Sequence, residues 1–151
     1  MPIDQLQALI WDMDGTLIDS GAVVPDAFIA TVQAISGRTY TREQVIDLYP
    51  VGPPALMLTR LLGRPCTAAD LVEYHQRLLA PASTIQPYPE ISSVLTMLHG
   101  RLPMAVFTGA SSQAAHMLLE ETGLLGHFAV VVAGDQVDRQ KPYPDGVLRA
   151  C

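Results

Sequence analysis

The chain is poor in cysteine and has no long apolar run. Its two cysteines in 151 residues, Cys66 and Cys151, form no paired-cysteine motif, which argues against a disulfide framework and favours a reducing cytoplasm. The first residues, MPIDQLQ, carry an acid and no basic run, so they do not resemble a signal peptide. No stretch approaches the length needed to span a bilayer. We therefore expect a soluble, cytoplasmic protein without a membrane partner.

Basic residues are also scarce. Nine lysines and arginines stand against fifteen aspartates and glutamates, and the net charge of −6 argues against a nucleic-acid-binding surface, which is normally basic. A small phosphorylated substrate stays possible, because one basic side chain and a metal ion can neutralise its charge locally. Hydrophobic residues make up 49% of the chain, so a sizeable core is expected and intrinsic disorder is excluded. The length predicts one domain with a modest insertion.

Three short apolar runs predict the strands of a parallel sheet. They lack polar alternation, as strands buried on both faces do, and cover residues 8–11, 104–107 and 128–133. Amphipathic segments precede the second run and link it to the third: PEISSVLTMLHG and SSQAAHMLLEETG. In the latter, Ser111 or Ser112 can cap a helix. The predicted fold class is therefore α/β, with a Rossmann-like parallel sheet.

The residues between the first strand and this α/β unit contain no strand-like run. They show four candidate helices separated by breaks rich in proline and glycine, at 25–35, 41–48, 54–62 and 67–79. Two of these helices begin with the spacing of a capping box, Thr41 with Gln44 and Thr67 with Asp70. We predict a helical cap formed by residues 21–86, and a Rossmann-like core formed by residues 1–20 and 87–151.

Side chains and backbone groups suited to chemistry follow each predicted strand. Asp12 and Asp14 follow the first, Thr108 and Gly109 the second, and Lys141 lies in the loop after the third. The carboxyl ends of parallel strands meet at one edge, so we expect these groups to converge. Alone, an Asp-x-Asp pair is most often a solvated turn, Thr108 a helix cap and Lys141 a surface lysine. Their combination in this order predicts a phosphate site, since helix N-termini and lysine bind phosphate and carboxylates hold Mg²⁺.

The strings WDMDGTLIDS, VFTGAS and KPYPD, with a helical insertion after the first, resemble the haloacid dehalogenase (HAD) superfamily. Within it, the chain is most similar to small phosphatases with a helical cap, such as phosphoglycolate phosphatase and β-phosphoglucomutase relatives. The resemblance implies a HAD-like fold and a magnesium-dependent phosphatase that acts on a small phosphorylated metabolite.

The resemblance also implies a role for each site residue. Asp12 would be the nucleophile that forms an aspartyl-phosphate, and Asp14 would protonate the leaving oxygen and then activate water. Thr108 and the Gly109 amide would hold phosphoryl oxygens, and Lys141 would neutralise the nucleophile and the phosphate. Mg²⁺ would bind the Asp12 carboxylate and the Asp14 main-chain carbonyl. A haloalkanoate dehalogenase needs only the nucleophile, so the second acid favours phosphate esters.

The sequence departs from the family pattern after the lysine motif. Family members continue to another strand that ends in a Gly-Asp pair with a further acid, whereas this sequence stops at DGVLRAC. Asp135 precedes Lys141 and fits the loop before it better than it fits a metal site. We therefore expect the C-terminal part of the core to be missing and the first strand to be an exposed apolar edge. A truncated sequence, or a homo-oligomer or partner that covers this edge, would account for this.

Three functions are compatible with these observations. The leading hypothesis is a magnesium-dependent phosphatase, and the second is a sugar phosphomutase of the same superfamily. The third is a non-catalytic chain that keeps the phosphate pocket but cannot place Mg²⁺. No feature of the sequence identifies the phosphate ester.

Overall fold

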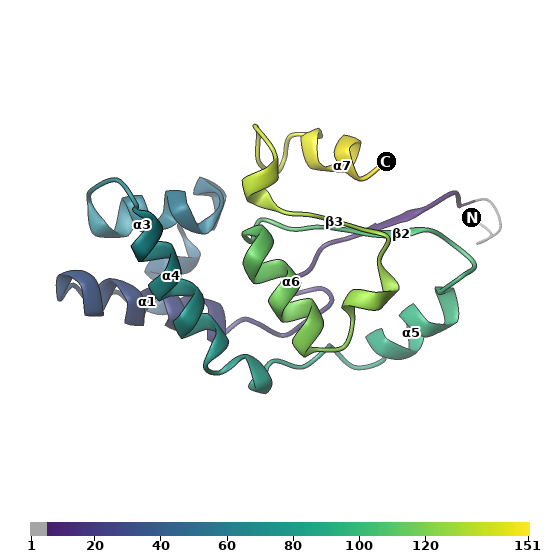
Figure 1. Ribbon diagram of the computed structural model, residues 1–151, viewed down its shortest axis with the longest axis horizontal. Coiled ribbons are helices and arrows are strands. Elements are labelled where there is room, and N and C mark those ends of the chain that lie inside the picture. Colours follow the sequence, from purple (N-terminus) through teal and green to yellow (C-terminus); the bar gives the residue numbers. More distant parts are fainter. Residues whose placement is uncertain (1–5) are drawn as a thin grey trace.

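The computed structural model describes residues 6–151 and contains a three-stranded parallel sheet (Figure 1). Strands β1 (Leu9–Trp11), β2 (Met104–Phe107) and β3 (Val130–Val132) lie in the order β1-β2-β3, and Ile10 lies opposite Ala105 in the β1-β2 pair. The three predicted strands and their parallel direction are confirmed. The carboxyl ends of all three strands therefore lie at one edge of the sheet. The candidate site residues follow these ends.

Only the central strand has the burial that the apolar runs predicted. All four residues of β2 are buried, whereas β1 is partly buried along its length and Val130 in β3 is 41% exposed. The expectation of strands buried on both faces is wrong for β1 and β3, because each lies at an edge of this sheet. Among the described residues β1 pairs with β2 alone, as expected for an apolar edge strand.

Helices cover both faces of the sheet. Figure 1 shows α5 (Ile91–Leu98) and α6 (Ser112–Glu121) on one side and the short helix α7 (Asp145–Ala150) on the other. Gly146 lets α7 approach β2 closely, because a Cβ atom at this position would lie 2.1 Å from the ring of Phe107. The close packing of α7 on this face of the sheet therefore requires glycine at position 146.

The residues between β1 and α5 form a second group of helices, here called the helical lobe (α1 to α4). Its helices correspond to the four predicted ones within a few residues: α1 (Val23–Ser36), α2 (Arg42–Ile46), α3 (Pro54–Leu62) and α4 (Ala68–Leu79). Both predicted capping boxes are present, at the starts of α2 and α4. Helix α1 packs against α4, where the ring centroids of Phe28 and Tyr74 are 4.4 Å apart.

Short 3₁₀ helices connect the larger elements. One of them, η2 (Tyr49–Val51), follows α2 at a place where the sequence predicted a helix end and a break. The others are η3 (Ala82–Thr84), η4 (Leu125–His127) and η5 (Gly134–Gln136). The position of η2 directs the aromatic side chain of Tyr49 toward the candidate site.

Two chain segments join the helical lobe to the sheet, and they run side by side. The N–H of Asp19 donates to the carbonyl of Gln86 at 2.9 Å, and the N–H of Tyr88 donates to the carbonyl of Leu17 at 3.0 Å. The two segments also form an isolated antiparallel bridge. The chain therefore leaves the sheet and returns to it at adjacent backbone positions.

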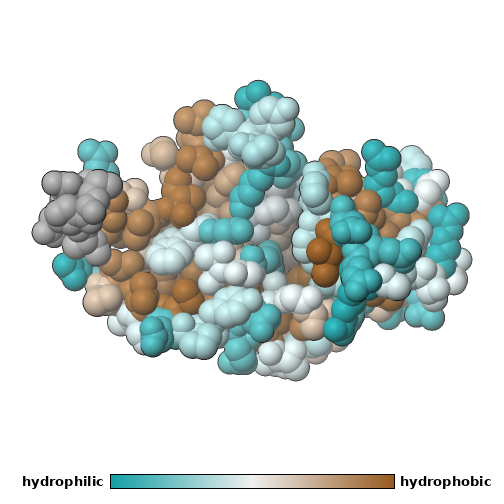
Figure 2. Space-filling model, turned by 180° about the vertical axis from the view of Figure 1, so that it is seen from behind, coloured by the Kyte–Doolittle hydropathy of each residue, from teal (hydrophilic) through white to brown (hydrophobic). Residues whose placement is uncertain are grey.

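Hydrophobic side chains gather over the part of the surface that belongs to the sheet layer. In Figure 2, the view from behind, the brown residues are concentrated toward the left, over the sheet layer, whereas the right of the view mixes teal, white and brown residues. Large hydrophobic residues exposed in this part of the chain include Val130 and, on α7, Leu148, which is 70% exposed. No helix within residues 6–151 combines the length and apolar character needed to cross a membrane.

Candidate active site

The turn that follows β1 directs two carboxylates toward one cavity. The Met13 carbonyl accepts three backbone hydrogen bonds from this turn, and the Met13 side chain is fully buried. Gly15 has φ +75°, a left-handed conformation that glycine adopts without steric cost. With the side chain between them anchored in the core, Asp12 and Asp14 both line the cavity.

Asp12 forms an ion pair with Lys141, which is distant from it in the sequence. The Lys141 Nζ atom lies 2.8 Å from Asp12 Oδ1, and the side chains are 42% and 47% exposed, respectively. The ammonium also lies 4.9 Å from the ring centroid of Phe107, which steers the lysine over β2. The structure thus brings the first and third motifs together at the mouth of the cavity.

Asp14 is held more tightly than Asp12. Ser20 Oγ donates a hydrogen bond to Asp14 Oδ1 at 2.5 Å, and Thr108 Oγ1 lies 3.4 Å from the other carboxyl oxygen. Burial raises the pKa of the Asp14 carboxyl above its ordinary value, and the nearby charge of Asp12 acts in the same direction, against the hydrogen bond from Ser20. The two acids of the motif are therefore inequivalent: one is accessible and ion-paired, and the other is desolvated.

Thr108 and Gly109 follow β2 as predicted and line the same cavity. Thr108 is fully buried, and its hydroxyl oxygen accepts a hydrogen bond from the Ala110 N–H at 3.1 Å. The Thr108 N–H donates to the Val132 carbonyl at 3.0 Å, which extends the pairing of β2 with β3 to the edge of the site. The loop that leads into α6 is thus fixed on both sides before any ligand binds.

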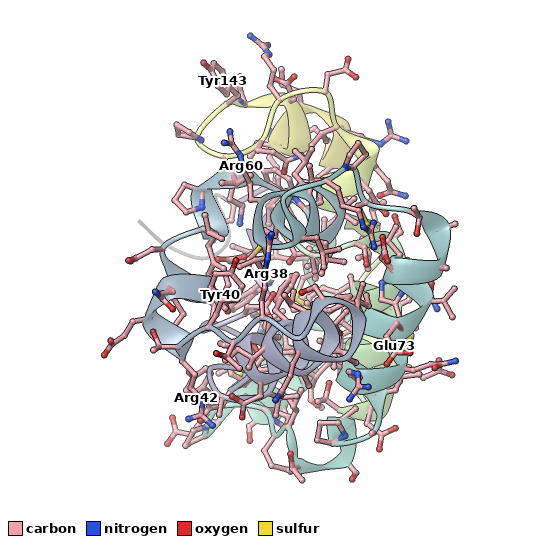
Figure 3. All side chains as sticks on the ribbon, turned by 90° about the vertical axis from the view of Figure 1, so that its left-hand side faces the viewer. Arg38, Tyr40, Arg42, Arg60, Glu73 and Tyr143 are labelled. Carbon is pink, nitrogen blue, oxygen red and sulfur yellow. The ribbon has the colours of Figure 1, made fainter. Side chains whose placement is uncertain are left out.

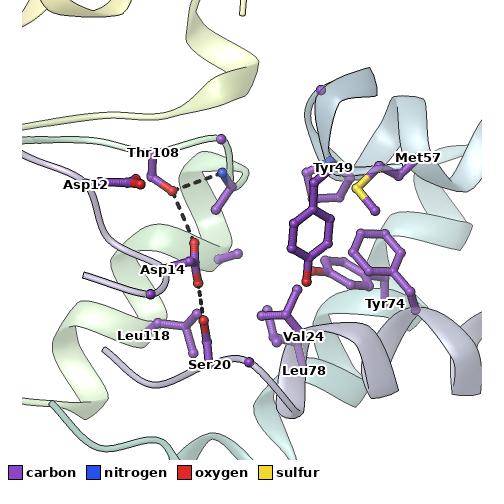
Figure 4. A pocket seen from close by; sticks show the side chains of 18 of the residues that line it. Asp12, Asp14, Ser20, Val24, Tyr49, Met57, Tyr74, Leu78, Thr108 and Leu118 are labelled. Atoms are coloured by element: carbon purple, nitrogen blue, oxygen red, sulfur yellow. Dashed lines mark hydrogen bonds between the residues drawn. The ribbon is translucent and has the colours of Figure 1, made fainter. Parts of the chain in front are cut away.

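The cavity has a volume of about 380 Å³ and two chemically different walls. Figure 4 shows the first wall, from the sheet layer, with Asp12, Asp14, Ser20, Thr108 and Leu118. The second wall faces it from the helical lobe and carries aromatic and aliphatic side chains, among them Tyr49, Met57, Tyr74, Val24 and Leu78. The candidate site therefore lies between the two groups of elements.

Several of these residues could not be predicted as part of a site. Ser20 lies within the first motif string, so its proximity to Asp14 had a weak signal that was missed. Tyr74 and Leu78 belong to the ordinary apolar face of a helix, and Tyr49 lies in a break between helices. Their contribution to the cavity arises from tertiary packing and left no motif in the sequence.

The turn after β1 offers a sparse oxygen site for a metal ion. The Asp12 carboxylate is accessible, and among residues 6–151 no hydrogen bond is directed at the Asp14 main-chain carbonyl. This donor set fits Mg²⁺, which keeps several waters and is bound through one or two carboxylates together with substrate phosphate. The part of the chain that the structure describes contains no group of three His, Cys, Asp or Glu residues that could hold a metal.

Asp135 is not among the residues that line the cavity. Its carboxylate accepts hydrogen bonds from the Ser112 N–H at 2.9 Å and from the Ser112 hydroxyl at 2.6 Å, at the first residue of α6. This position agrees with the expectation that Asp135 belongs to the loop before Lys141. Its charge is used at a helix N-terminus, where an acid is favourable.

A buried hydrogen bond joins the helical lobe to α6, the helix that follows β2. His75 Nε2 lies 2.8 Å from Ser111 Oγ, and both side chains are buried. Ser111 also accepts a hydrogen bond from the Ala114 N–H at 3.3 Å, which makes it the cap of α6. This bond uses a lone pair of the Ser111 oxygen and leaves the hydroxyl proton available, so the hydroxyl can donate to a neutral His75 ring. The contact links α4 directly to the start of α6.

A family model described as haloacid dehalogenase-like hydrolase matches residues 6–151. Fructose-1-phosphate phosphatase YqaB of Escherichia coli (strain K12) is 32% identical over 153 residues, covering 96% of this chain and 78% of that protein. Phosphoglycolate phosphatase of Aquifex aeolicus (strain VF5) is 28% identical over 147 residues, covering 95% and 68%. The crystal structure of CbbY from Rhodobacter sphaeroides in complex with phosphate has the same fold, with a TM-score of 0.83 at 24% identity over 96% of this chain and 71% of that one. The chain therefore belongs to the haloacid dehalogenase-like hydrolases.

Proposed function

We propose that the protein is a magnesium-dependent phosphatase that hydrolyses a small organic phosphate monoester through an aspartyl-phosphate intermediate. The observation that carries this proposal is the convergence of Asp12, Asp14, Thr108 and Lys141 on one wall of a cavity of about 380 Å³. Similar proteins named as phosphatases, one for fructose 1-phosphate and one for phosphoglycolate, support the same reaction class.

In the first chemical step, a carboxylate oxygen of Asp12 attacks phosphorus while the bond between phosphorus and the ester oxygen breaks. Asp14 donates its proton to the leaving oxygen, so that an alcohol departs and the phosphoryl group stays on Asp12. The desolvated position of Asp14, next to the accessible Asp12, is compatible with this division of roles. A carboxylate nucleophile divides one difficult substitution into two easier ones.

In the second step, Asp14 accepts a proton from water as the water oxygen attacks phosphorus. The bond between phosphorus and Asp12 breaks, which releases inorganic phosphate and restores both carboxyl groups. Throughout, Thr108 and the Gly109 amide would hold phosphoryl oxygens, and Lys141 would balance the negative charge. The Asp12 carboxylate and the Asp14 carbonyl would hold Mg²⁺, which when bound would offset the charge of the phosphoryl oxygens.

We further propose that the helical lobe acts as a cap over this site. Its aromatic wall faces the carboxylates across the cavity (Figure 4), and it is connected to the sheet by two paired segments. Closure of such a cap would exclude bulk water and so protect the aspartyl-phosphate from premature hydrolysis.

Release of inorganic phosphate from a panel of small phosphate esters tests the proposal. We expect turnover that EDTA abolishes and added Mg²⁺ restores, and a loss of about 100-fold or more in Asp12→Asn. Asp47→Asn is the matched control, because Asp47 is an exposed acid outside the cavity. No phosphate release from any ester, with Asp12→Asn indistinguishable from the wild type, would refute the proposal. Isomerisation of a sugar phosphate without free phosphate would identify a phosphomutase instead.

A further inference from the structure

The wall of the cavity contributed by the helical lobe is aromatic and aliphatic. It includes Val24, Phe28, Tyr49, Met57, Tyr74 and Leu78. All charged residues among those that line the cavity, Asp12, Asp14 and Lys141, come from the opposite wall. Figure 4 shows this separation, with the carboxylates on one side of the space and the aromatic rings on the other. The end of the cavity that is distant from the phosphate site is therefore uncharged.

The arginines of the helical lobe do not supply a cation to this wall, since none of them lines the cavity. Most are engaged elsewhere: Arg38 with the carbonyls of Leu61 and Leu62, Arg42 with Asp26, Arg64 with Asp70, and Arg77 with Glu73. Arg60 is exposed. Figure 3 shows Arg42 and Glu73 at the periphery of the lobe.

An anionic leaving group would therefore be poorly accommodated. A carboxylate or a second phosphate at the lobe end of the cavity would lose its water and meet apolar side chains without a cationic partner. Removing a charge from water without pairing it is one of the costliest events in binding. The carboxylate of Asp12, across the cavity, would repel such a group further.

Two phenol groups make the same wall suitable for hydroxyl groups. The Tyr40 hydroxyl donates to the Leu61 carbonyl at 2.8 Å, whereas neither the Tyr49 nor the Tyr74 hydroxyl has a protein partner among the described residues. Burial raises the pKa of Tyr49 to about 12 and raises that of Tyr74 as well, so both stay neutral and can donate or accept. Their rings offer apolar faces against which carbon-bound hydrogens can pack.

We propose that the substrate is a monophosphate whose leaving group is uncharged and hydroxylated, that is, a small sugar or polyol monophosphate rather than a phosphorylated carboxylic acid or a bisphosphate. This inference rests on the proposed phosphatase function. The lobe wall acts as the specificity determinant, because it lines the cavity without a cation and carries two phenol hydroxyls that have no partner within residues 6–151. A volume of about 380 Å³ is near the lower end of ligand cavities, which fits a compact substrate.

Two pairs of esters, in each of which one member carries a second anionic group in place of a hydroxyl-bearing end, test the inference on the wild-type chain. Glycerol 3-phosphate is compared with 3-phosphoglycerate, and fructose 1-phosphate with fructose 1,6-bisphosphate. We expect kcat/KM to favour the member without the second anionic group in each pair by about 100-fold. Equal or better turnover of 3-phosphoglycerate or 2-phosphoglycolate would overturn the inference while leaving the phosphatase function intact.

Binding to Asp12→Asn, measured by calorimetry, separates this inference from the proposed function. If the wild type hydrolyses no ester, the phosphatase function fails, but binding of the same pairs to Asp12→Asn still reports the preference of the cavity. Stronger binding of glycerol 3-phosphate than of 3-phosphoglycerate supports the inference, and equal or reversed affinities contradict it.

Adding a cation to the wall should reverse the preference. Met57 is buried at the cavity, whereas Leu56 on the same helix is 48% exposed and outside it. We expect Met57→Lys to improve turnover of 3-phosphoglycerate relative to glycerol 3-phosphate by at least tenfold, on the scale of one charge-assisted contact (roughly 1.5–3 kcal/mol), and Leu56→Lys to leave the ratio unchanged. Tyr49→Phe, at a residue 41% exposed, should raise KM for glycerol 3-phosphate but not for phenyl phosphate. Unchanged ratios in a folded Met57→Lys, with no effect of Tyr49→Phe, would contradict the assignment of this wall.

Discussion

Asp12 and Lys141 are held together at a distance of 2.8 Å, yet both side chains are more than 40% exposed. Water and salt screen an ion pair of this kind, so its contribution to the stability of the fold is small. The ring of Phe107 beneath the ammonium fixes the position of the lysine instead. At the scale of the residue, loss of this pair would therefore cost little stability, whereas under the proposed mechanism it would remove the charge that neutralises the phosphate.

The variant Lys141→Met separates the two contributions, because methionine keeps an unbranched apolar chain over Phe107 and removes the charge. We expect the free energy of unfolding in urea to change by less than about 1 kcal/mol. Phosphatase turnover should fall by about 100-fold or more, since the phosphate loses its cationic partner. A large loss of stability, or retention of full activity, would contradict the role given to the pair.

At the scale of the element, α7 illustrates how one glycine positions a helix. A Cβ atom at Gly146 would meet the Phe107 ring at 2.1 Å, and Phe107 is itself buried in β2 and in contact with Lys141. A methyl group here cannot be accommodated without moving either the helix or the ring. The close packing of α7 is therefore coupled to the position of the catalytic lysine proposed above.

We expect Gly146→Ala to lower the free energy of unfolding by roughly 1–3 kcal/mol, although alanine is the better helix former. Gly126→Ala is the matched control, because a Cβ atom at Gly126 has no neighbour within 4 Å and its backbone is not in the left-handed region. Chemical denaturation of the two variants measures the difference. Equal stabilities would show that α7 is free to shift.

Elements with local signals could be predicted from the sequence, and those set by tertiary packing could not. The apolar runs located the strands, and Thr67 with Asp70 located the start of α4, because a capping box acts within one turn. The strand order brought Asp12, Thr108 and Lys141 together through a general rule of parallel sheets. Tyr49 carried no such signal, since its direction depends on how η2 packs against the sheet layer.

At the scale of the whole molecule, the buried contact between His75 and Ser111 ties the helical lobe to α6. Burial lowers the pKa of His75 below its ordinary value of 6.5, and the negative charge of Asp135, which lies in η5, offsets this only in part. A neutral ring with its proton on Nδ1 can accept a hydrogen bond from the Ser111 hydroxyl at Nε2, and a protonated ring cannot accept one. The folded state therefore favours the neutral form.

A pH dependence of stability follows from the sign of this shift. Because the unfolded chain binds a proton at His75 more readily, the folded state loses stability as the pH falls through 6.5 toward the lower folded pKa. We expect His75→Gln to lose less unfolding free energy than the wild type over this range, and an NMR titration of the His75 ring to have its midpoint below 6.5. A midpoint above 6.5 would contradict the expectation.

The paired segments between the sheet and the helical lobe have a consequence for chain entropy. Asp19 and Gln86 are hydrogen-bonded neighbours. Residues 21–86 therefore form one long loop inserted into the sheet layer, and its two ends are already held together. Lengthening a closed loop is inexpensive, at about 0.6 kcal/mol for each doubling of its length. The lobe can therefore change in size with little entropic cost to the strand ends that carry Asp12 and Thr108, so that, under the proposed function, substrate recognition and chemistry could be altered separately.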